Sequence, residues 1–172
     1  LGDIITYKNG VTCEIANTDA EGRIVLADGL MAASETNSPV IIDAATLTGA
    51  AVLATGGDYT ALFALDQTAA EEIKQSAMQV NEPIWQLPLE TWHQDKCPSA
   101  FADTANSRTQ KGGGAGGASN AAGFLARFVR DEGKGWLHLD LAAAYNGNAN
   151  GFWAAGATGV SIATIADLIL KK

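Results

Sequence analysis

Short apolar runs that alternate with helical patterns are the feature that most constrains the fold of this chain. Residues 40–42, Val-Ile-Ile, form an unbroken apolar run that ends at Asp43, which is typical of a central strand covered on both faces. Helical periodicity precedes this run over residues 24–33, and the helix there is expected to be largely buried. A further strand is predicted at residues 61–65, followed by an exposed helix at residues 68–80. This order of strands and helices indicates an α/β fold.

The remaining segments predict a hairpin at the start of the sequence and a helix near its end. Residues 4–7 and 11–15 are rich in β-forming residues, and Asn9-Gly10 between them supplies the positive φ angles of a tight turn. Prolines and a glycine-rich stretch make residues 81–117 a region of loops and short pieces. Three more elements are predicted after it: a helix with Ser119 as its N-cap that runs through Phe128, a strand at residues 136–141, and an amphipathic helix at residues 160–170.

Composition and charge limit the class of protein. With 172 residues, of which 47% are hydrophobic, residues 1–172 are expected to form a single domain. The 11 basic and 19 acidic residues give a net charge of −8, which argues against nucleic acid and anionic membranes as partners. No stretch approaches the roughly 18 to 20 apolar residues of a membrane span, so the prediction is a soluble, cytoplasmic protein. Cys13 and Cys97 lack a metal-binding spacing and are expected to be buried, reduced thiols.

The densest chemistry lies in residues 17–23, Asn-Thr-Asp-Ala-Glu-Gly-Arg. Asp19, Glu21 and Arg23 follow one another at intervals of two, which points all three side chains to one side of an extended or turning loop. Carboxylate oxygens are suitable ligands for divalent cations, and two of them can bridge a pair of metals. On spacing alone, a capping box formed by Thr18 and Glu21 is the better explanation. Three charges crowded at the start of a buried helix favour a metal site, because unpaired buried charge is costly.

These residues carry a resemblance to the leucyl aminopeptidase (cytosol aminopeptidase) family. Residues 17–23 look like the signature heptapeptide of that family, and residues 43–50, DAATLTGA, match a second block at the expected distance. Further matches at residues 136–142 and 156–159 extend the resemblance over nearly the whole chain. The opening LGDIITYKNG and the ending GATGVSIATIADL look most like the bacterial peptidase B branch. The resemblance implies the C-terminal part of a catalytic domain, with a mixed central β-sheet flanked by helices.

The resemblance also implies roles in a dinuclear metal site with two Mn²⁺ or Zn²⁺ ions. Asp19 would be a ligand of one metal, and Glu21 would bridge both. Arg23 is the expected catalytic residue, holding a bicarbonate ion that serves as general base, with main-chain amides near Gly22 and Leu47 helping to position it. An arginine suits this role because its planar fork can donate two parallel hydrogen bonds to an oxyanion.

Substrate binding is implied for a second group of residues. The family positions that line the substrate cleft correspond to Thr46, Leu47, Gly49 and Ala142, and Tyr145 falls where a side chain closes the pocket for the N-terminal residue. Tyr145 departs from the Met of some relatives, which leaves the side-chain preference open. The expected activity is release of N-terminal amino acids from peptides with a free N-terminus, by a protein that forms a homohexamer.

Part of the family's site has no counterpart in this sequence. Family members supply a lysine and two aspartates as further metal ligands, and a catalytic lysine, from a segment before the opening hairpin, and Lys8 matches none of them. Because the sequence begins at Leu1 and enters a strand pattern almost at once, we expect a partial catalytic domain whose N-terminal portion is missing through truncation or cleavage. The 172 residues alone are therefore expected to be inactive.

Other functions are weighed against this one. A chain without its other metal ligands could be a non-catalytic assembly or binding domain, and a Lys-x-x-x-x-Asp pattern with a later Asp upstream of Leu1 would distinguish an enzyme from such a module. Gly112, Gly114 and Gly117 formally satisfy a dinucleotide-binding GxGxxG pattern, but the segment before them is polar, which favours a loop. His93 and His138 lie outside any HExxH motif and are interpreted as structural.

Overall fold

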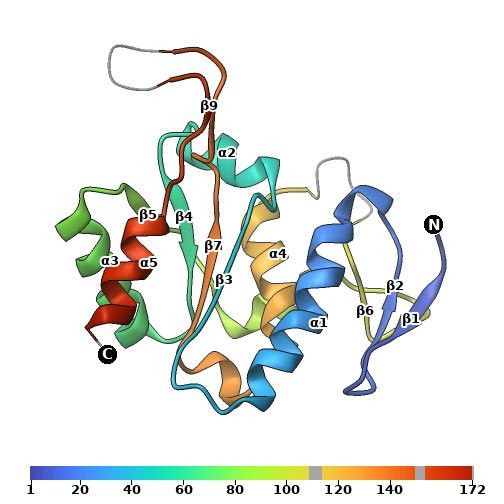
Figure 1. The fold of residues 1–172 in the computed structure, drawn as a ribbon. Helices are drawn as coiled ribbons and strands as arrows, with labels where there is room; N and C mark the ends of the chain where they lie inside the picture. Colours follow the sequence, from blue (N-terminus) through green and yellow to red (C-terminus); the bar gives the residue numbers. More distant parts are fainter. Residues whose placement is uncertain (109–113, 150–153, 172) are drawn as a thin grey trace.

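A four-stranded mixed sheet lies at the centre of the computed structural model, which describes residues 1–108, 114–149 and 154–171 (Figure 1). Its strand order is β3-β7-β4-β5. β3 pairs parallel with β7, β7 pairs antiparallel with β4, and β4 pairs parallel with β5. The strands are β3 (Ile41–Ala45), β7 (Trp136–Asp140), β4 (Thr60–Phe63) and β5 (Ile84–Gln86). The expected α/β class with a mixed central sheet is confirmed.

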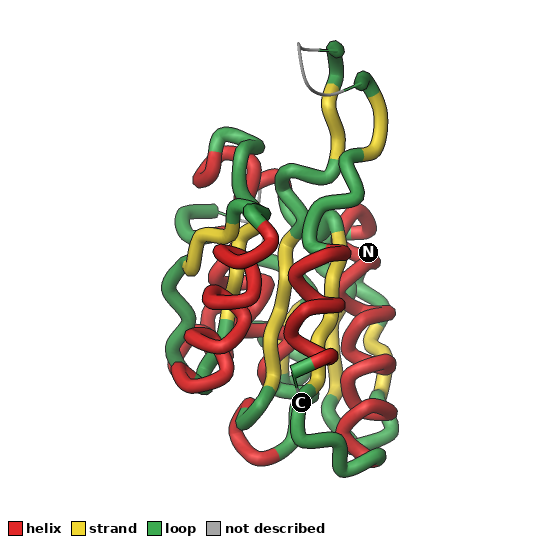
Figure 2. The backbone as a smooth tube through the Cα atoms, turned by 60° about the vertical axis from the view of Figure 1, so that its left-hand side comes forward, coloured by secondary structure: helices red, strands yellow, loops and turns green. Residues whose placement is uncertain are grey.

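Helices cover both faces of this sheet and divide its core in two (Figures 1 and 2). α1 (Glu21–Glu35) and α4 (Gly117–Ala126) share one hydrophobic cluster with Ile41, Phe63 and Trp136. α3 (Gln67–Val80) and α5 (Ile162–Leu170) belong to the opposite cluster, which contains the strand residues of the other pleat. These alternate strand residues are Leu62, Leu137 and Leu139. The period-2 alternation of the strands therefore assigns each side chain to one helical layer.

A second, three-stranded sheet lies beside α1, with the order β1-β2-β6. β1 (Ile4–Thr6) and β2 (Thr12–Glu14) form the expected hairpin, and β6 (Thr104–Ala105) pairs parallel with β2. This pairing brings the middle of the chain next to its beginning. The remaining elements are short: η1 (Thr18–Ala20), α2 (Gly49–Thr55), η2 (Thr91–Lys96), η4 (Asp131–Gly133), β8 (Tyr145–Asn146) and β9 (Gly156–Ala157). β8 and β9 pair in the hairpin that projects from the body in Figures 1 and 2. Among the described helices, none is long and apolar enough to cross a bilayer.

Four local predictions are wrong in instructive ways. β3 is covered on both faces, yet it is an edge strand among those described rather than a central one, because facial burial is independent of lateral pairing. α1 buries one stripe only, and Val25 is 69% exposed. Ser119 lies inside α4, whose N-cap is Gly116 in the left-handed region. In the first hairpin only Gly10, not Asn9, has a positive φ angle.

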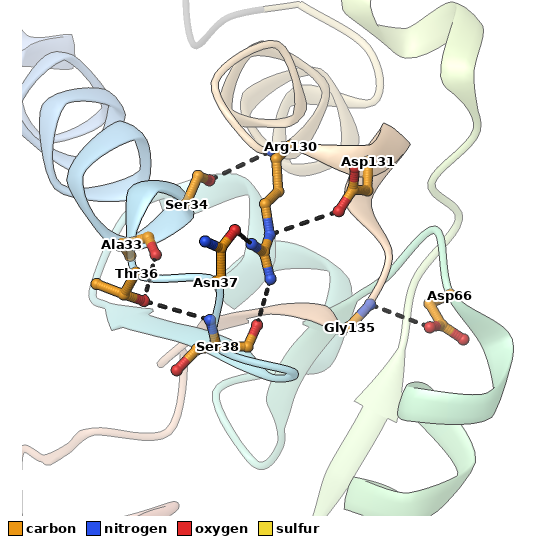
Figure 3. Close-up of polar contacts among 9 residues, drawn as sticks. All are labelled: Ala33, Ser34, Thr36, Asn37, Ser38, Asp66, Arg130, Asp131 and Gly135. Carbon is orange, nitrogen blue, oxygen red and sulfur yellow. Dashed lines mark hydrogen bonds and ion pairs between the residues drawn. The ribbon is translucent and has the colours of Figure 1, made fainter.

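Arg130 fastens the end of the sheet at which β3 and β7 begin (Figure 3). Its main-chain amide donates to Ser34 Oγ at 3.2 Å, and its guanidinium donates to Asn37 Oδ1 and, at 2.6 Å, to the Ser38 carbonyl. Asp131 lies 3.5 Å from the same guanidinium. The loop between α1 and β3 is thus tied to the segment that leads into β7.

Gly123 lies where α4 and η2 approach most closely, and a Cβ atom there would fall 2.5 Å from the main-chain carbonyl of His93. Gly123→Ala is expected to lower the free energy of unfolding by about 1–3 kcal/mol, because neither backbone can move aside cheaply. Gly29→Ala is the matched control, since nothing lies within 4 Å of a Cβ on that exposed turn of α1. It should stabilise the helix by about 0.5–1 kcal/mol. Urea unfolding followed by circular dichroism measures both, and equal stabilities would show that α4 and η2 do not meet at Gly123.

Candidate active site

A cavity of about 980 Å³ opens where β3 ends and where α1 and α4 begin. Its walls come from segments that are far apart in the sequence. Eighteen described residues line it: Asn17, Asp19, Ala20, Arg23, Leu47, Thr48, Gly49, Ala50, Leu53, Ala54, Leu87, Pro88, Ser107, Gly114, Gly116, Gly117, Ala118 and Ser119. Carboxyl ends of strands and amino ends of helices are where α/β proteins place ligands, so this cavity is the candidate site.

The carboxylates predicted as metal ligands lie on a short 3-10 turn and the helix that follows it. Asn17 begins the turn, and its Oδ1 accepts a hydrogen bond from the Asp19 amide at 2.9 Å. The alternative of a capping box is wrong, because the N-cap of α1 is Ala20 and carries no side-chain bond. Thr18 instead is the first residue of η1. Asp19 is exposed on the cavity wall, and Glu21, the first residue of α1, is exposed beside it in the chain.

Arg23 is the most unusual group on the cavity wall. Its side chain extends from the buried face of α1, and the residue is only 8% exposed. One guanidinium nitrogen, Nη1, donates to the Asn106 carbonyl at 2.9 Å, while the buried Nε has no partner among the described residues. Burial lowers the pKa of this guanidinium, although arginine remains charged in proteins. A buried cation with an unused N–H beside a cavity fits a small planar oxyanion.

Asp140, which the sequence analysis did not single out, organises the loop after β3. It is 1% exposed at the end of β7. Its Oδ1 accepts hydrogen bonds from the amides of Leu47 at 3.0 Å and Thr48 at 3.2 Å, and its Oδ2 accepts one from Thr48 Oγ1 at 2.6 Å. Thr48 Oγ1 in turn accepts from the Ala51 amide at the start of α2. In the sequence, Asp140 stands out only as part of the matched block at residues 136–142 and as a carboxylate at the end of a buried apolar strand.

This arrangement bears on the expected bicarbonate site. The Leu47 amide is occupied by Asp140, so in this structure it does not point a free N–H at an anion. The side chain of Leu47 packs against α1, since its Cδ1 lies 3.3 Å from where a Cβ on Gly22 would be. Of the three residues expected to hold bicarbonate, Arg23 and Leu47 line the cavity, and Arg23 has a buried Nε without a partner among the described residues.

The structure brings some of the predicted site residues together and leaves others apart. Asp19, Arg23, Leu47 and Gly49 line the cavity. Tyr145 lies on β8 in the projecting hairpin and is 71% exposed. The other predicted residues also lie off the wall of this cavity: Glu21, Gly22, Thr46 and Ala142. Their roles stay predictions.

The donor set suits divalent cations in kind. Asp19 and Glu21 offer carboxylate oxygens, which bind Mn²⁺ and Zn²⁺. Within residues 1–108, 114–149 and 154–171, no three His, Cys, Asp or Glu side chains gather closely enough to hold a metal ion.

The two histidines and two cysteines are buried, as expected. His138 Nδ1 lies 2.5 Å from Asp43 Oδ1, and Trp136 Nε1 donates to Asp43 Oδ2 at 2.7 Å. Cys13 and Cys97 are free and buried, and burial raises the pKa of the Cys13 thiol to about 11. Of the glycine pattern, Gly112 lies outside the described residues.

Comparison with known proteins gives the class of this protein. The model of the cytosol aminopeptidase family, catalytic domain, matches residues 1–166, and the chain belongs to that family. The expected likeness to the peptidase B branch is also confirmed. Peptidase B of Pectobacterium carotovorum subsp. carotovorum (strain PC1) and peptidase B of Yersinia pestis (strain Pestoides F) are each 53% identical over all 172 residues. The chain spans 39% of the length of these relatives.

Solved structures of relatives share the fold. A mutant of tomato leucine aminopeptidase superposes with a TM-score of 0.89 at 37% identity, over 99% of this chain and 32% of that one. The bottromycin maturation enzyme BotP in complex with Mn gives a TM-score of 0.89 at 35% identity, over 99% of this chain and 38% of that one.

The three hydrogen bonds to Asp140 generate a test. Asp140→Ala leaves the Leu47 and Thr48 amides and the Thr48 hydroxyl without their acceptor, and an unsatisfied buried donor costs about 1–3 kcal/mol. We expect the free energy of unfolding to fall by about 3 kcal/mol and amide exchange at Leu47 and Thr48 to accelerate. Hydrogen exchange followed by NMR measures this. Unchanged exchange at both amides would contradict the role of Asp140.

Proposed function

We propose that the protein containing this chain is a dinuclear metal-dependent aminopeptidase that releases N-terminal amino acids from peptides, and that these residues supply part of its active site. One observation carries the proposal. The buried Arg23, whose Nε has no partner among the described residues, lines a cavity that Asp19 also lines, in a chain of the cytosol aminopeptidase family. A buried cation without a carboxylate partner is costly unless an anion completes it.

In this proposal the residues around the start of α1 divide the work. Asp19 would be a ligand of one metal ion, and Glu21 would be a ligand of both. When bound, two divalent ions lower the pKa of water and polarise the scissile carbonyl. Arg23 would hold bicarbonate, the proposed general base, and main-chain amides near Gly22 and Leu47 would help to position it. The guanidinium suits this position because it stays charged when buried and its planar fork fixes the orientation of a planar oxyanion.

The proposal also names the substrate contacts, the metal ions and the location of the protein. Thr46, Leu47, Gly49, Ala142 and Tyr145 would contact a peptide with a free N-terminus. Mn²⁺ and Zn²⁺ are the proposed ions, and the Mn complex of BotP, a structural relative, supports the first. A cytoplasmic location is proposed from the family's description as cytosol aminopeptidases.

The exchange Glu21→Gln in the full-length protein tests the assignment. Loss of the proposed bridging charge should lower the hydrolysis of a leucine anilide by several orders of magnitude and weaken Mn²⁺ binding. Glu35→Gln is the control, because it removes a carboxylate at the other end of α1 whose partner is the exposed Lys8. Full activity of Glu21→Gln with a chelator present would reject the proposal.

In the same assay the 172-residue chain alone is expected to be inactive, because Asp19 and Glu21 are too few ligands for two cations.

Assembly is a separate part of the proposal. We expect the full-length protein to form a homohexamer, as is typical of the family this chain belongs to. Light scattering coupled to gel filtration measures the mass directly. A fully active monomer would overturn the proposed assembly without touching the proposed chemistry.

A further inference from the structure

Asn106 is fully buried, and within the described part of the chain the hydrogen bonds of its side-chain amide go to the segment that carries Asp19. It follows β6, and none of its surface is exposed. Its Oδ1 accepts hydrogen bonds from the amides of Ala16 at 2.9 Å and Asn17 at 3.1 Å. Its Nδ2 donates to the carbonyls of Asn17 at 2.7 Å and Ala20 at 3.2 Å. One side chain therefore satisfies four main-chain groups within five residues.

The main chain of Asn106 fixes a second group, the proposed catalytic arginine. The Asn106 carbonyl accepts the 2.9 Å hydrogen bond from Arg23 Nη1. The Asn106 amide donates to the Glu14 carbonyl at 3.0 Å, which continues the parallel pairing of Glu14 with Ala105. Asn106 is thus anchored on the small sheet and contacts both the turn with Asp19 and the guanidinium of Arg23.

We propose that Asn106 is a positioning residue for the proposed aminopeptidase site: it holds residues 16–20 and Arg23 in one fixed arrangement before any ligand binds. The inference rests on the proposed function for its catalytic meaning. The turn needs such support because a 3-10 turn of three residues has few bonds of its own. A fixed position of residues 16–20 and Arg23 matters because small displacements of catalytic groups strongly reduce the reaction rate.

The chemistry of the amide explains why this position requires asparagine. Two main-chain donors and two main-chain acceptors face the side chain, and a primary amide is the group that offers two lone pairs and two N–H bonds together. An aspartate of the same shape could accept from Ala16 and Asn17 but could not donate to Asn17 and Ala20. It would also add a negative charge next to a turn that already carries Asp19.

The test uses Asn106→Asp and Asn106→Ala in the full-length protein. Thr60→Val is the matched control, because Thr60 is equally buried and its hydroxyl bonds to Ser161 on the far side of the central sheet. In the metal-free protein we expect amide exchange at Ala16 and Asn17 to accelerate at least tenfold in Asn106→Ala but not in Thr60→Val. Affinity for Mn²⁺, measured by calorimetry, should fall at least tenfold in both Asn106 variants, and kcat should fall about a hundredfold with little change in KM.

Two results separate this inference from its alternatives. If the Asn106 variants and Thr60→Val lower Tm equally while exchange at Ala16 and Mn²⁺ affinity stay as in the wild type, Asn106 only stabilises the fold and the inference is overturned. If the wild-type protein neither binds Mn²⁺ nor hydrolyses peptides, the proposed function fails instead. Exchange at Ala16 and Asn17 then still decides whether Asn106 holds the turn. Should Asn106→Ala not fold, Asn106→Asp gives the Mn²⁺ affinity and kcat readouts, since it loses both donor bonds of the amide but keeps the acceptor for Ala16 and Asn17.

Discussion

The buried carboxylate of Asp140 is the interaction on which the site depends. Because β3 and β7 run parallel in register, Asp140 lies opposite Ala45, and the loop that leaves β3 must pass over it. Three donors from Leu47 and Thr48 satisfy the carboxylate, which is the condition for burying such a charge. The same bonds set the direction of the loop and the start of α2. The part of the cavity wall formed by Leu47 and Thr48 is therefore set by the hydrogen bonds that satisfy the Asp140 carboxylate.

The cavity is also lined by a buried positive charge, the guanidinium of Arg23. Arg23 has one acceptor, the Asn106 carbonyl, and no carboxylate within salt-bridge distance among the described residues. Asp140 favours its charged form at longer range, against the desolvation that lowers its pKa. A buried cation without a carboxylate partner is costly to the fold, which supports the proposal that Arg23 serves a function there.

The loops at the two ends of the central sheet differ in structure. At the end where β3 and β7 begin, Arg130 and Asp66 close the loops with hydrogen bonds between side chains and main chain (Figure 3). At the other end the cavity opens, and the buried Nε of Arg23, one of its lining residues, has no partner among the described residues. Loops fixed by hydrogen bonds at one end of the sheet and a cavity at the other end are the pattern expected when a stable scaffold carries binding groups.

The sequence by itself determined the α/β class, most strands and helices, and the family, because periodicity and the motif at residues 17–23 are local properties of the chain. It also identified Asp19, Arg23 and Leu47 as neighbours of one site. The edge position of β3, the rejection of the capping box and the roles of Asp140 and Asn106 were decided only by tertiary structure. Asn106 lies 89 residues from Asn17 along the chain, in a segment without periodicity, and its four bonds are to main-chain atoms. Such bonds leave no pattern in the side chains of their partners, so no reading of residue types could have found them.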